Sequence, residues 1–154
     1  MLMTSLAAIE EAPRPRPISG GTQFDLNSDE THRILVVDDD ETVLELMTET
    51  LGRHRYQVDV ARSCGDALPL ILFRDYCGII LDLILPDANG LSLFRQISNR
   101  RPRLRPRVIF VTGAMDSGEA QRFIKLIDNR ILLKPFRLHD LVSAVHQVDS
   151  RPLG

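Results

Sequence analysis

The sequence predicts an α/β fold in which a parallel five-stranded sheet carries helices on both of its faces. Short runs rich in strand-forming residues recur five times between residues 33 and 134, and stretches with apolar residues at helical spacing follow them. Four of these runs are continuously apolar, which is typical of strands buried on both faces. Alternation of such strands with amphipathic helices indicates a sheet enclosed by two helical layers.

The first strand and the first helix are predicted at 34–37 and from about 43 to 51. The strand is the apolar run Ile-Leu-Val-Val, which three aspartates end. The helix is marked by a stripe at positions i, i+3, i+4, i+7 and i+8, which consists of Val43, Leu46, Met47, Thr50 and Leu51. Gly52 follows this stripe, and we expect the helix to stop there because glycine commonly ends helices.

The second strand is predicted at 56–60, where strand-forming residues alternate with others. The residues from Ser63 to Asp66 resemble a helix start, with an acid three positions after a capping serine. Pro69 would break this helix internally, because proline lacks the N–H donor, unless the helix begins only near Leu68.

The rest of the chain repeats this alternation. Buried strands are predicted at 78–81, 108–111 and 131–133, and apolar residues at helical spacing mark helices around 91–97, 120–127 and 138–148. Right-handed crossovers between parallel strands leave few topologies. For this size the natural one is the flavodoxin-like (βα)5 sandwich of three layers, with strand order 2-1-3-4-5 numbered along the chain.

Composition places the chain among ordinary globular proteins. It has 154 residues, a formal net charge of −2 and 44% hydrophobic residues, so it carries no excess of positive charge suited to nucleic acid. No segment approaches the roughly 20 apolar residues of a membrane span, and the apolar run at 6–9 is too short for a signal sequence. Cys64 and Cys77 lack metal-ligand spacing, and we expect them to be reduced and buried in a soluble, cytoplasmic protein.

One domain is predicted from 32 to 150, between two short tails. In residues 1–31 proline recurs at every second position from Pro13 to Pro17, which no helix tolerates. We expect this segment to be a disordered leader, with a short docking motif as the alternative. Residues 151–154 form a short C-terminal tail.

Polar residues gather where the predicted strands end. Asp38 and Asp39 follow the first strand, and Asp82, Thr112 and Lys134 follow the third, fourth and fifth. Because the carboxyl ends of parallel strands point to one edge of the sheet, these side chains should share a pocket beside the reversal of strand order.

The residue types predict phosphoryl chemistry in this pocket. Clustered carboxylates repel one another unless a cation joins them, and hard oxygen ligands of this kind suit Mg²⁺. Asp82 can then act as a nucleophile that forms an aspartyl phosphate. The Thr112 hydroxyl and the Lys134 ammonium can stabilise the charge on the phosphoryl oxygens.

Four motifs at these strand ends resemble those of the receiver domains of two-component response regulators. In chain order they are Val36-Val-Asp-Asp-Asp40, Leu81-Asp-Leu-Ile-Leu-Pro-Asp-Ala-Asn-Gly90, Val111-Thr-Gly113 and Leu133-Lys-Pro-Phe136. The resemblance runs from about Arg33 to Val148, which is nearly the whole chain outside the N-terminal tail.

The resemblance implies a metal site and a phosphoacceptor. Asp82 is the implied phosphoacceptor and a ligand of Mg²⁺. Asp38 and Asp39 form the acidic pocket, with Asp39 as a direct ligand, and the backbone carbonyl of Ile84 supplies a further ligand. Thr112 is the implied switch hydroxyl.

The resemblance also implies the remaining contacts and the partners. Lys134 pairs with the phosphoryl group, and the peptide bond before Pro135 is cis. A sensor histidine kinase or a histidine phosphotransfer protein donates the phosphoryl group. The chain ends about six residues after its last predicted helix, so we expect a stand-alone switch rather than a metabolic enzyme. Its output is a downstream protein bound to the face formed by 120–127, 131–133 and 138–148.

Three positions depart from the family pattern or refine it. Ile131 stands where family members usually carry Tyr or Phe, so we expect the signal to leave through backbone shifts of the adjacent helix and strand, or the coupling to be weak. Asn129 replaces a small-residue turn and could adopt the left-handed conformation. Ile84, two residues after Asp82, cannot orient an attacking water, which predicts a long-lived aspartyl phosphate.

The sequence leaves two alternatives to a phosphorylated receiver domain. A hydrolase of the haloacid-dehalogenase kind would need Asp-x-Asp after the first strand, and a degenerate receiver would act only as a binding module. The arginine-rich run at 95–107 is interpreted as a solvated loop, because no recognition pattern for nucleic acid accompanies it. The four histidines are scattered, and no metal site is expected among them.

Overall fold

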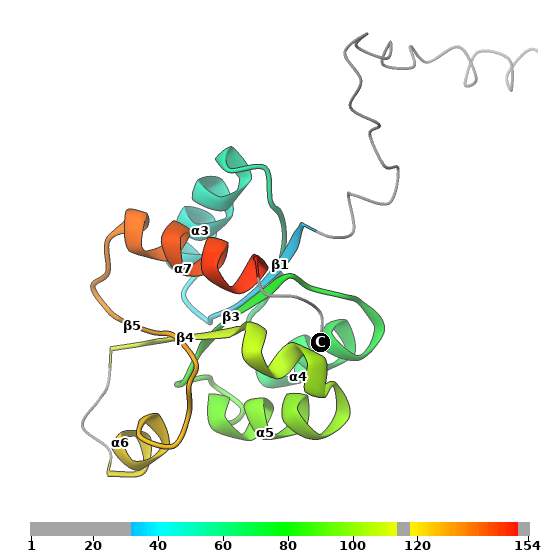
Figure 1. Cartoon of the computed structure of the whole chain (residues 1–154), viewed down its shortest axis with the longest axis vertical. Helices are drawn as coiled ribbons and strands as arrows, with labels where there is room; N and C mark the ends of the chain where they lie inside the picture. The colour runs from blue at the N-terminus through cyan, green and yellow to red at the C-terminus, as the bar shows by residue number, and fades with distance from the viewer. Residues whose placement is uncertain (1–31, 114–117, 151–154) are drawn as a thin grey trace, which may run out of the picture.

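The computed structural model describes residues 32–113 and 118–150, and in these ranges it forms a five-stranded parallel sheet flanked by helices (Figure 1). The strand order is β2-β1-β3-β4-β5, which confirms the predicted flavodoxin-like topology. The strands are β1 (Arg33–Val37), β2 (Gln57–Ala61), β3 (Gly78–Asp82), β4 (Val108–Thr112) and β5 (Ile131–Leu133). The helices are α3 (Glu41–Arg53), α4 (Cys64–Phe73), α5 (Gly90–Arg100), the 3₁₀ helix η1 (Pro102–Arg107), α6 (Gly118–Ile124) and α7 (Leu138–Asp149).

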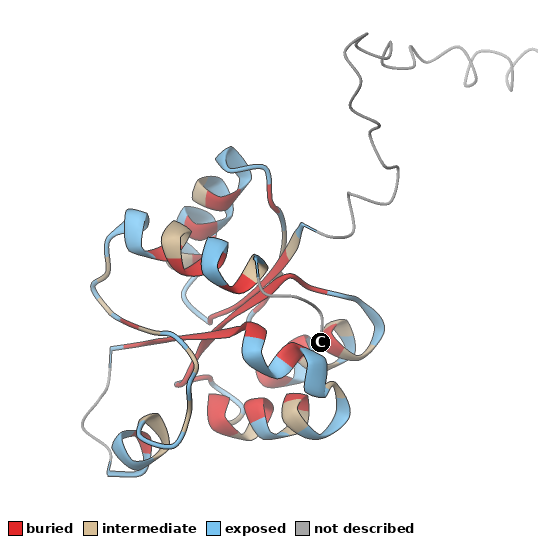
Figure 2. Ribbon diagram, in the orientation of Figure 1, coloured by how far each residue is buried: buried red, intermediate tan, exposed pale blue. Residues whose placement is uncertain are grey.

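The helices cover both faces of the sheet, and each face has its own apolar core. Figure 1 shows α3 and α7 on one side of the sheet and α4 and α5 on the other. One core joins the strands to Leu44 and Met47 of α3 and to Leu141 of α7. The other joins them to Ile71 of α4 and Phe94 of α5. The three central strands are therefore almost fully buried, as Figure 2 shows, which explains their continuous apolar sequence.

Two helix starts agree with the capping signals in the sequence. The Asp40 carboxylate caps α3 by accepting hydrogen bonds from the backbone N–H groups of Thr42 and Val43. The Ser63 hydroxyl caps α4 by accepting from the N–H of Asp66. Such caps satisfy N–H groups that have no partner within the helix, which fixes where the helix begins.

The prediction that α3 stops at Gly52 was wrong. The helix continues to Arg53, and the left-handed residue that follows it is Arg55, with φ of 68°. The Arg55 and Tyr56 N–H groups donate to the carbonyls of Gly52 and Leu51, so the last turn is closed by backbone bonds. A side chain at position 52 would meet no atom within 4 Å, so nothing there requires glycine.

The expectation that Pro69 excludes a helix start before Leu68 was also wrong. The helix α4 begins at Cys64 and contains Pro69. Its first turn is held from outside, because the Asp87 carboxylate accepts hydrogen bonds of 2.9 Å from the N–H groups of both Cys64 and Gly65. These bonds and the burial of the apolar side of α4 stabilise the helix. They offset the loss of the one hydrogen bond that Pro69 cannot donate.

The arginine-rich run is only partly a solvated loop. Residues 102–107 form η1, and Arg107 is buried, with Nη1 donating to the carbonyls of Cys77 at 3.0 Å and Val148 at 3.4 Å. Arg101 Nη1 likewise donates to two carbonyls at the end of α4. The solvated interpretation was therefore wrong for Arg107 and Arg101, whose guanidinium groups donate hydrogen bonds to backbone carbonyls of other elements.

The segment before β5 also differs from expectation. Among the described residues Arg55 is the one non-glycine residue with positive φ, so the left-handed conformation suggested for Asn129 is wrong. The Asn129 amide instead donates to the carbonyls of Arg105 and Val108, at 2.8 Å each. The helix α6 ends at Ile124, so Ile127 lies outside it although it packs against the core.

Several smaller predictions are confirmed. The Lys134–Pro135 peptide bond is cis. Cys64 and Cys77 are buried and free, and burial raises the pKa of Cys77 to about 12. In 32–113 and 118–150, no helix is both long and apolar enough to cross a bilayer. The predicted tails, 1–31 and 151–154, lie outside the described residues, and the domain limits stay a prediction.

The buried position of Arg107 gives a test of the fold. We expect Arg107→Ala to lower the free energy of unfolding by about 2 kcal/mol, because two carbonyls lose a charged donor. Arg103→Ala, at an exposed position of the same 3₁₀ helix, should change it by less than about 0.5 kcal/mol. Urea unfolding followed by circular dichroism measures both, and equal losses would contradict a structural role for Arg107.

Candidate functional site

Two aspartates meet at the carboxyl edge of the sheet. Asp38 follows β1 and Asp82 ends β3, and these strands are neighbours, with Val37 paired to Leu81. Both aspartates are almost completely buried. The adjacent positions of the two strands therefore place their carboxylates side by side, as the sequence predicted.

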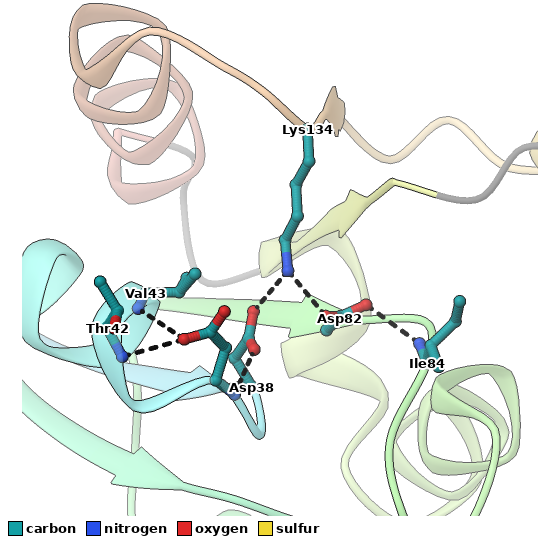
Figure 3. Close-up of polar contacts among 7 residues, drawn as sticks. Asp38, Thr42, Val43, Asp82, Ile84 and Lys134 are labelled. Carbon is teal, nitrogen blue, oxygen red and sulfur yellow. Dashed lines mark hydrogen bonds and ion pairs between the residues drawn. The ribbon is translucent and has the colours of Figure 1, made fainter.

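Lys134 joins the two carboxylates (Figure 3). Its Nζ donates to Asp38 Oδ2 and to Asp82 Oδ2, at 2.9 Å each. The backbone of Lys134 is fixed by its N–H, which donates to the Thr112 carbonyl at 2.9 Å. A lysine from the edge strand thus reaches past β4 to the acids of β1 and β3.

Each carboxylate uses its other oxygen to bind the turn that follows its strand. Asp38 Oδ1 accepts from the N–H of Asp40 at 2.9 Å, and Asp82 Oδ1 accepts from the N–H of Ile84 at 3.0 Å. Figure 3 shows these bonds on either side of the lysine. The local turns therefore orient both carboxylates toward Lys134.

Burial and ion pairing have opposite effects on the pKa values of Asp82 and Lys134. Burial raises the pKa of Asp82, and the Ile84 N–H and the Lys134 ammonium reduce this rise without cancelling it. Burial alone would lower the pKa of Lys134, but its bonds to Asp38 and Asp82 outweigh burial and raise it. The ammonium is therefore held in its charged form, between carboxylates that it neutralises only in part.

A third acid completes a cation-binding group. Asp38, Asp39 and Asp82 each offer a carboxylate oxygen, and these oxygens lie within 4.8 Å of one another. In the part of the chain that the structure describes, this is the one cluster of three or more such ligands. The donors are all hard oxygens, which fits Mg²⁺ and does not fit a metal that prefers nitrogen or sulfur.

Thr112 and Ile84 lie at the border of this group. Thr112 is fully buried at the end of β4, one residue beyond Val111, which pairs with Asp82. The Ile84 side chain is 59% exposed beside the site, and its backbone is held by the bond from its N–H to Asp82. The strand ends thus bring Asp38, Asp39, Asp82 and Lys134 together, with Thr112 on the neighbouring strand.

Gly90 is a residue of the site to which the sequence assigned no role beyond the end of the second motif. A Cβ at this position would lie 2.3 Å from the Asp82 carbonyl oxygen and 2.9 Å from Leu83 Cα. The Gly90 N–H donates to the Leu83 carbonyl at 2.9 Å. Glycine is therefore needed for the start of α5 to approach the backbone that carries Asp82. The pair Asn89-Gly90 is typical of a turn, but it does not indicate that α5 starts in contact with the backbone of Asp82.

Asp87 is a second residue whose role the sequence did not reveal. Its bonds to the N–H groups of Cys64 and Gly65 tie the loop after β3 to the start of α4. The same backbone bonds lower the pKa of its carboxyl group, so it stays ionised. The partners are more than 20 residues away in the chain, and no local pattern indicates them.

Comparison with known proteins agrees with this geometry. Residues 34–146 match the family model described as the response regulator receiver domain. Over 113 residues the chain is 29% identical to the transcriptional regulatory protein DltR of Streptococcus agalactiae, which covers 73% of this chain and 50% of DltR. The chain spans about half the length of the curated relatives it matches.

Solved structures of receiver domains share the fold. The CheY-like receiver domain protein from Methanospirillum hungatei has a TM-score of 0.69 and 29% identity, and the match covers 76% of this chain and 93% of that one. The non-phosphorylated HemR receiver domain from Leptospira biflexa has a TM-score of 0.68 and 33% identity, covering 78% and 97%. Family model, strand order and site agree, and the chain belongs to the receiver domains of two-component response regulators.

Proposed function

We propose that this chain is a phosphorylation-dependent signalling switch in which Asp82 accepts a phosphoryl group from a sensor histidine kinase or a histidine phosphotransfer protein. The observation that carries the proposal is the contact of Asp82 with Lys134 within a cluster of three carboxylates. Receiver domains are signalling modules and generally not enzymes, and we assign no metabolic reaction to this one. Transfer from such donors places its action in the cytoplasm.

In the proposed transfer, a carboxylate oxygen of Asp82 attacks the phosphorus of a phosphohistidine. The new O–P bond forms as the P–N bond breaks, and its electron pair returns to the imidazole of the donor. Asp38, Asp39, Asp82 and the backbone carbonyl of Ile84 would hold Mg²⁺, which when bound neutralises charge on the phosphoryl oxygens. The carboxylate oxygens of the three aspartates lie within 4.8 Å of one another, which supports this proposal.

Lys134 and Thr112 then stabilise the product. The Lys134 ammonium already lies 2.9 Å from an Asp82 oxygen, so it can pair with a phosphoryl oxygen after a small movement. Phosphorylation replaces one negative charge by roughly two, which strengthens this pairing. The Thr112 hydroxyl donates to another phosphoryl oxygen. Its displacement would move β4, whose Thr112 carbonyl holds Lys134.

The output is a downstream protein bound to the face made by α6, β5 and α7. Large apolar side chains are exposed there, namely Leu126, Leu133 and Leu138. Exposed leucines offer a partner apolar area that costs little to desolvate. Ile131 lacks the ring or hydroxyl of the usual aromatic, so the signal reaches this face through backbone shifts of α6 and β5.

A binding module that works without phosphorylation is the second candidate, and Ile131 is the observation that favours it. Beryllofluoride with Mg²⁺ separates the two, because an active switch must move amide NMR signals around residues 113 to 137. An aspartyl-phosphate hydrolase is the less favoured alternative. Its Asp-x-Asp pair would be Asp38 and Asp40 after β1, but the Asp40 carboxylate caps α3, and Asp82 on β3 would have no part in such a pair.

The phosphoacceptor is tested with a small phosphodonor. We expect acetyl phosphate and Mg²⁺ to add one phosphoryl group to the wild-type chain and none to Asp82→Asn, because an amide is not a nucleophile of comparable strength. Intact-protein mass spectrometry measures the addition. Asp40→Asn is the matched control, since this acid caps α3, and it should be modified normally. Modification that survives in Asp82→Asn would place the acceptor elsewhere.

Lys134 gives a test in which two readouts move in opposite directions. We expect Lys134→Met to slow phosphorylation about a hundredfold, as when one preorganised donor is lost. The same change should tighten Mg²⁺ binding at least about fivefold, because unit charges about 4 Å apart interact by about 1 kcal/mol even when water screens them fully. Lys125→Met, at the other lysine of the chain, is the control and should change neither. Weaker Mg²⁺ binding in Lys134→Met would show that the ammonium does not compete with the metal.

Ile84 gives a test of phosphoryl lifetime. We expect Ile84→Asn to speed the loss of phosphate by roughly tenfold, less than a general base contributes, because an amide orients water without taking its proton. Ile84→Val keeps the apolar character and should leave the rate unchanged. The decay of purified phosphoprotein measures both. An unaltered lifetime in Ile84→Asn would mean that this exposed side chain does not control access of water.

A further inference from the structure

The helix α4 exposes apolar side chains toward its C-terminal end. Cys64, Ala67 and Ile71 are buried, and Leu68 and Leu70 pack half-buried against the same core. Phe73 is 85% exposed, and Pro69 is exposed as well. Gly65 and Asp66 are the exposed residues at the other end, so the uncovered apolar surface is the part around Phe73. The described residues cover only one side of α4, so the outer side lacks a partner within them.

Arginines surround the end of α4 where Phe73 lies. Arg101 reaches it directly, because Nη1 donates to the carbonyls of Ile71 and Leu72, at 3.2 Å each. Its chain neighbours Arg100 and Arg103 are exposed, and neither forms an ion pair within 32–113 and 118–150. The end of α4 therefore offers an apolar side chain next to unpaired positive charge, which suits an acidic segment with apolar residues.

The point where the chain enters the sheet lies beside this end of α4. Arg33, the first residue of β1, and Arg74, the residue after Phe73, bind the same carboxylate. Arg33 Nη1 donates to Asp59 Oδ1 at 3.1 Å, and Arg74 Nη1 donates to Asp59 Oδ2 at 2.8 Å. A segment that precedes β1 thus starts within a few side-chain lengths of Phe73.

The sequence just before β1 has the complementary chemistry. Residues 23–31 read Gln-Phe-Asp-Leu-Asn-Ser-Asp-Glu-Thr, with three acids, two apolar residues and no base. Arg33 lies nine positions after Phe24, and an extended chain of that length spans about 30 Å. The ten residues of α4 are about 15 Å long, so a segment anchored at Arg33 is long enough to fold back and bring Phe24 to Phe73.

We propose that residues 23–31 dock on the outer side of α4. Phe24 and Leu26 would contact Phe73, and the acids would lie near Arg100 and Arg103. The contact would be made within one chain and in the unphosphorylated state. It does not depend on phosphorylation of Asp82, so its failure leaves the proposed function untouched.

Amide NMR on the full chain tests the proposal from both sides. The double variant Phe24→Ser, Leu26→Ser should shift amide signals of residues 68–75. The control Leu2→Ser, Leu6→Ser removes two apolar residues elsewhere in 1–31 and should not shift them. Conversely, Phe73→Ser should shift signals of 23–27, whereas Leu126→Ser, at a similarly exposed leucine, should not. Addition of salt should reduce the shifts that the Phe24→Ser, Leu26→Ser variant causes in residues 68–75, because salt screens the contacts between the acids and the arginines.

The outcomes distinguish the possible occupants of the helix surface. Signals of α4 that do not respond to the 24/26 variant would overturn the proposal. Signals of α4 that move with protein concentration, from about 20 to about 500 µM, would assign the surface to a second copy of the chain and also overturn it. The remaining spectrum reports whether each variant is folded, so loss of folding cannot be mistaken for loss of docking.

Discussion

The site depends on one ammonium shared by two buried carboxylates. Asp38 and Asp82 are almost inaccessible to water, so their mutual repulsion is poorly screened. A buried charge without a partner costs several kcal/mol, which is why buried acids are paired or bind metals. Lys134 supplies that pairing, with one hydrogen bond to each carboxylate. The ends of β1, β3 and β5 must therefore hold Asp38 and Asp82 within hydrogen-bonding distance of Lys134.

The fold meets this requirement through short local devices at the strand ends. The turns after β1 and β3 each return an N–H to the carboxylate that precedes them, which leaves one oxygen of each free for the lysine. Gly90 allows α5 to start in contact with the backbone of Asp82, and Asp87 ties the same loop to α4. The positions of Asp38 and Asp82 are thus fixed by contacts with the backbone of the neighbouring turns and of α5.

Sequence reasoning predicted the strands and most of the site because both follow from local patterns. Buried parallel strands are continuous apolar runs, and a polar residue at the end of each run marks the reactive edge. Apart from the end of α3, the errors have a common cause in contacts between residues far apart in the chain. Arg107 and Asn129 bind distant carbonyls, and Asp87 holds a helix start that contains Pro69. No periodicity encodes such bonds.

The absence of an aromatic residue at position 131 does not leave α6 disconnected from the strand that ends at Thr112. Phe110, Phe94 and Phe123 form a cluster of edge-to-face rings with centroids 5.0 to 5.5 Å apart, which joins β4, α5 and α6. Phe110 precedes Thr112 by two residues, so both side chains lie on the same face of β4. Ile131 packs against the same core. In the proposed switch, a movement of the end of β4 would therefore press on Phe123 and shift the backbone of α6, without an aromatic residue on β5.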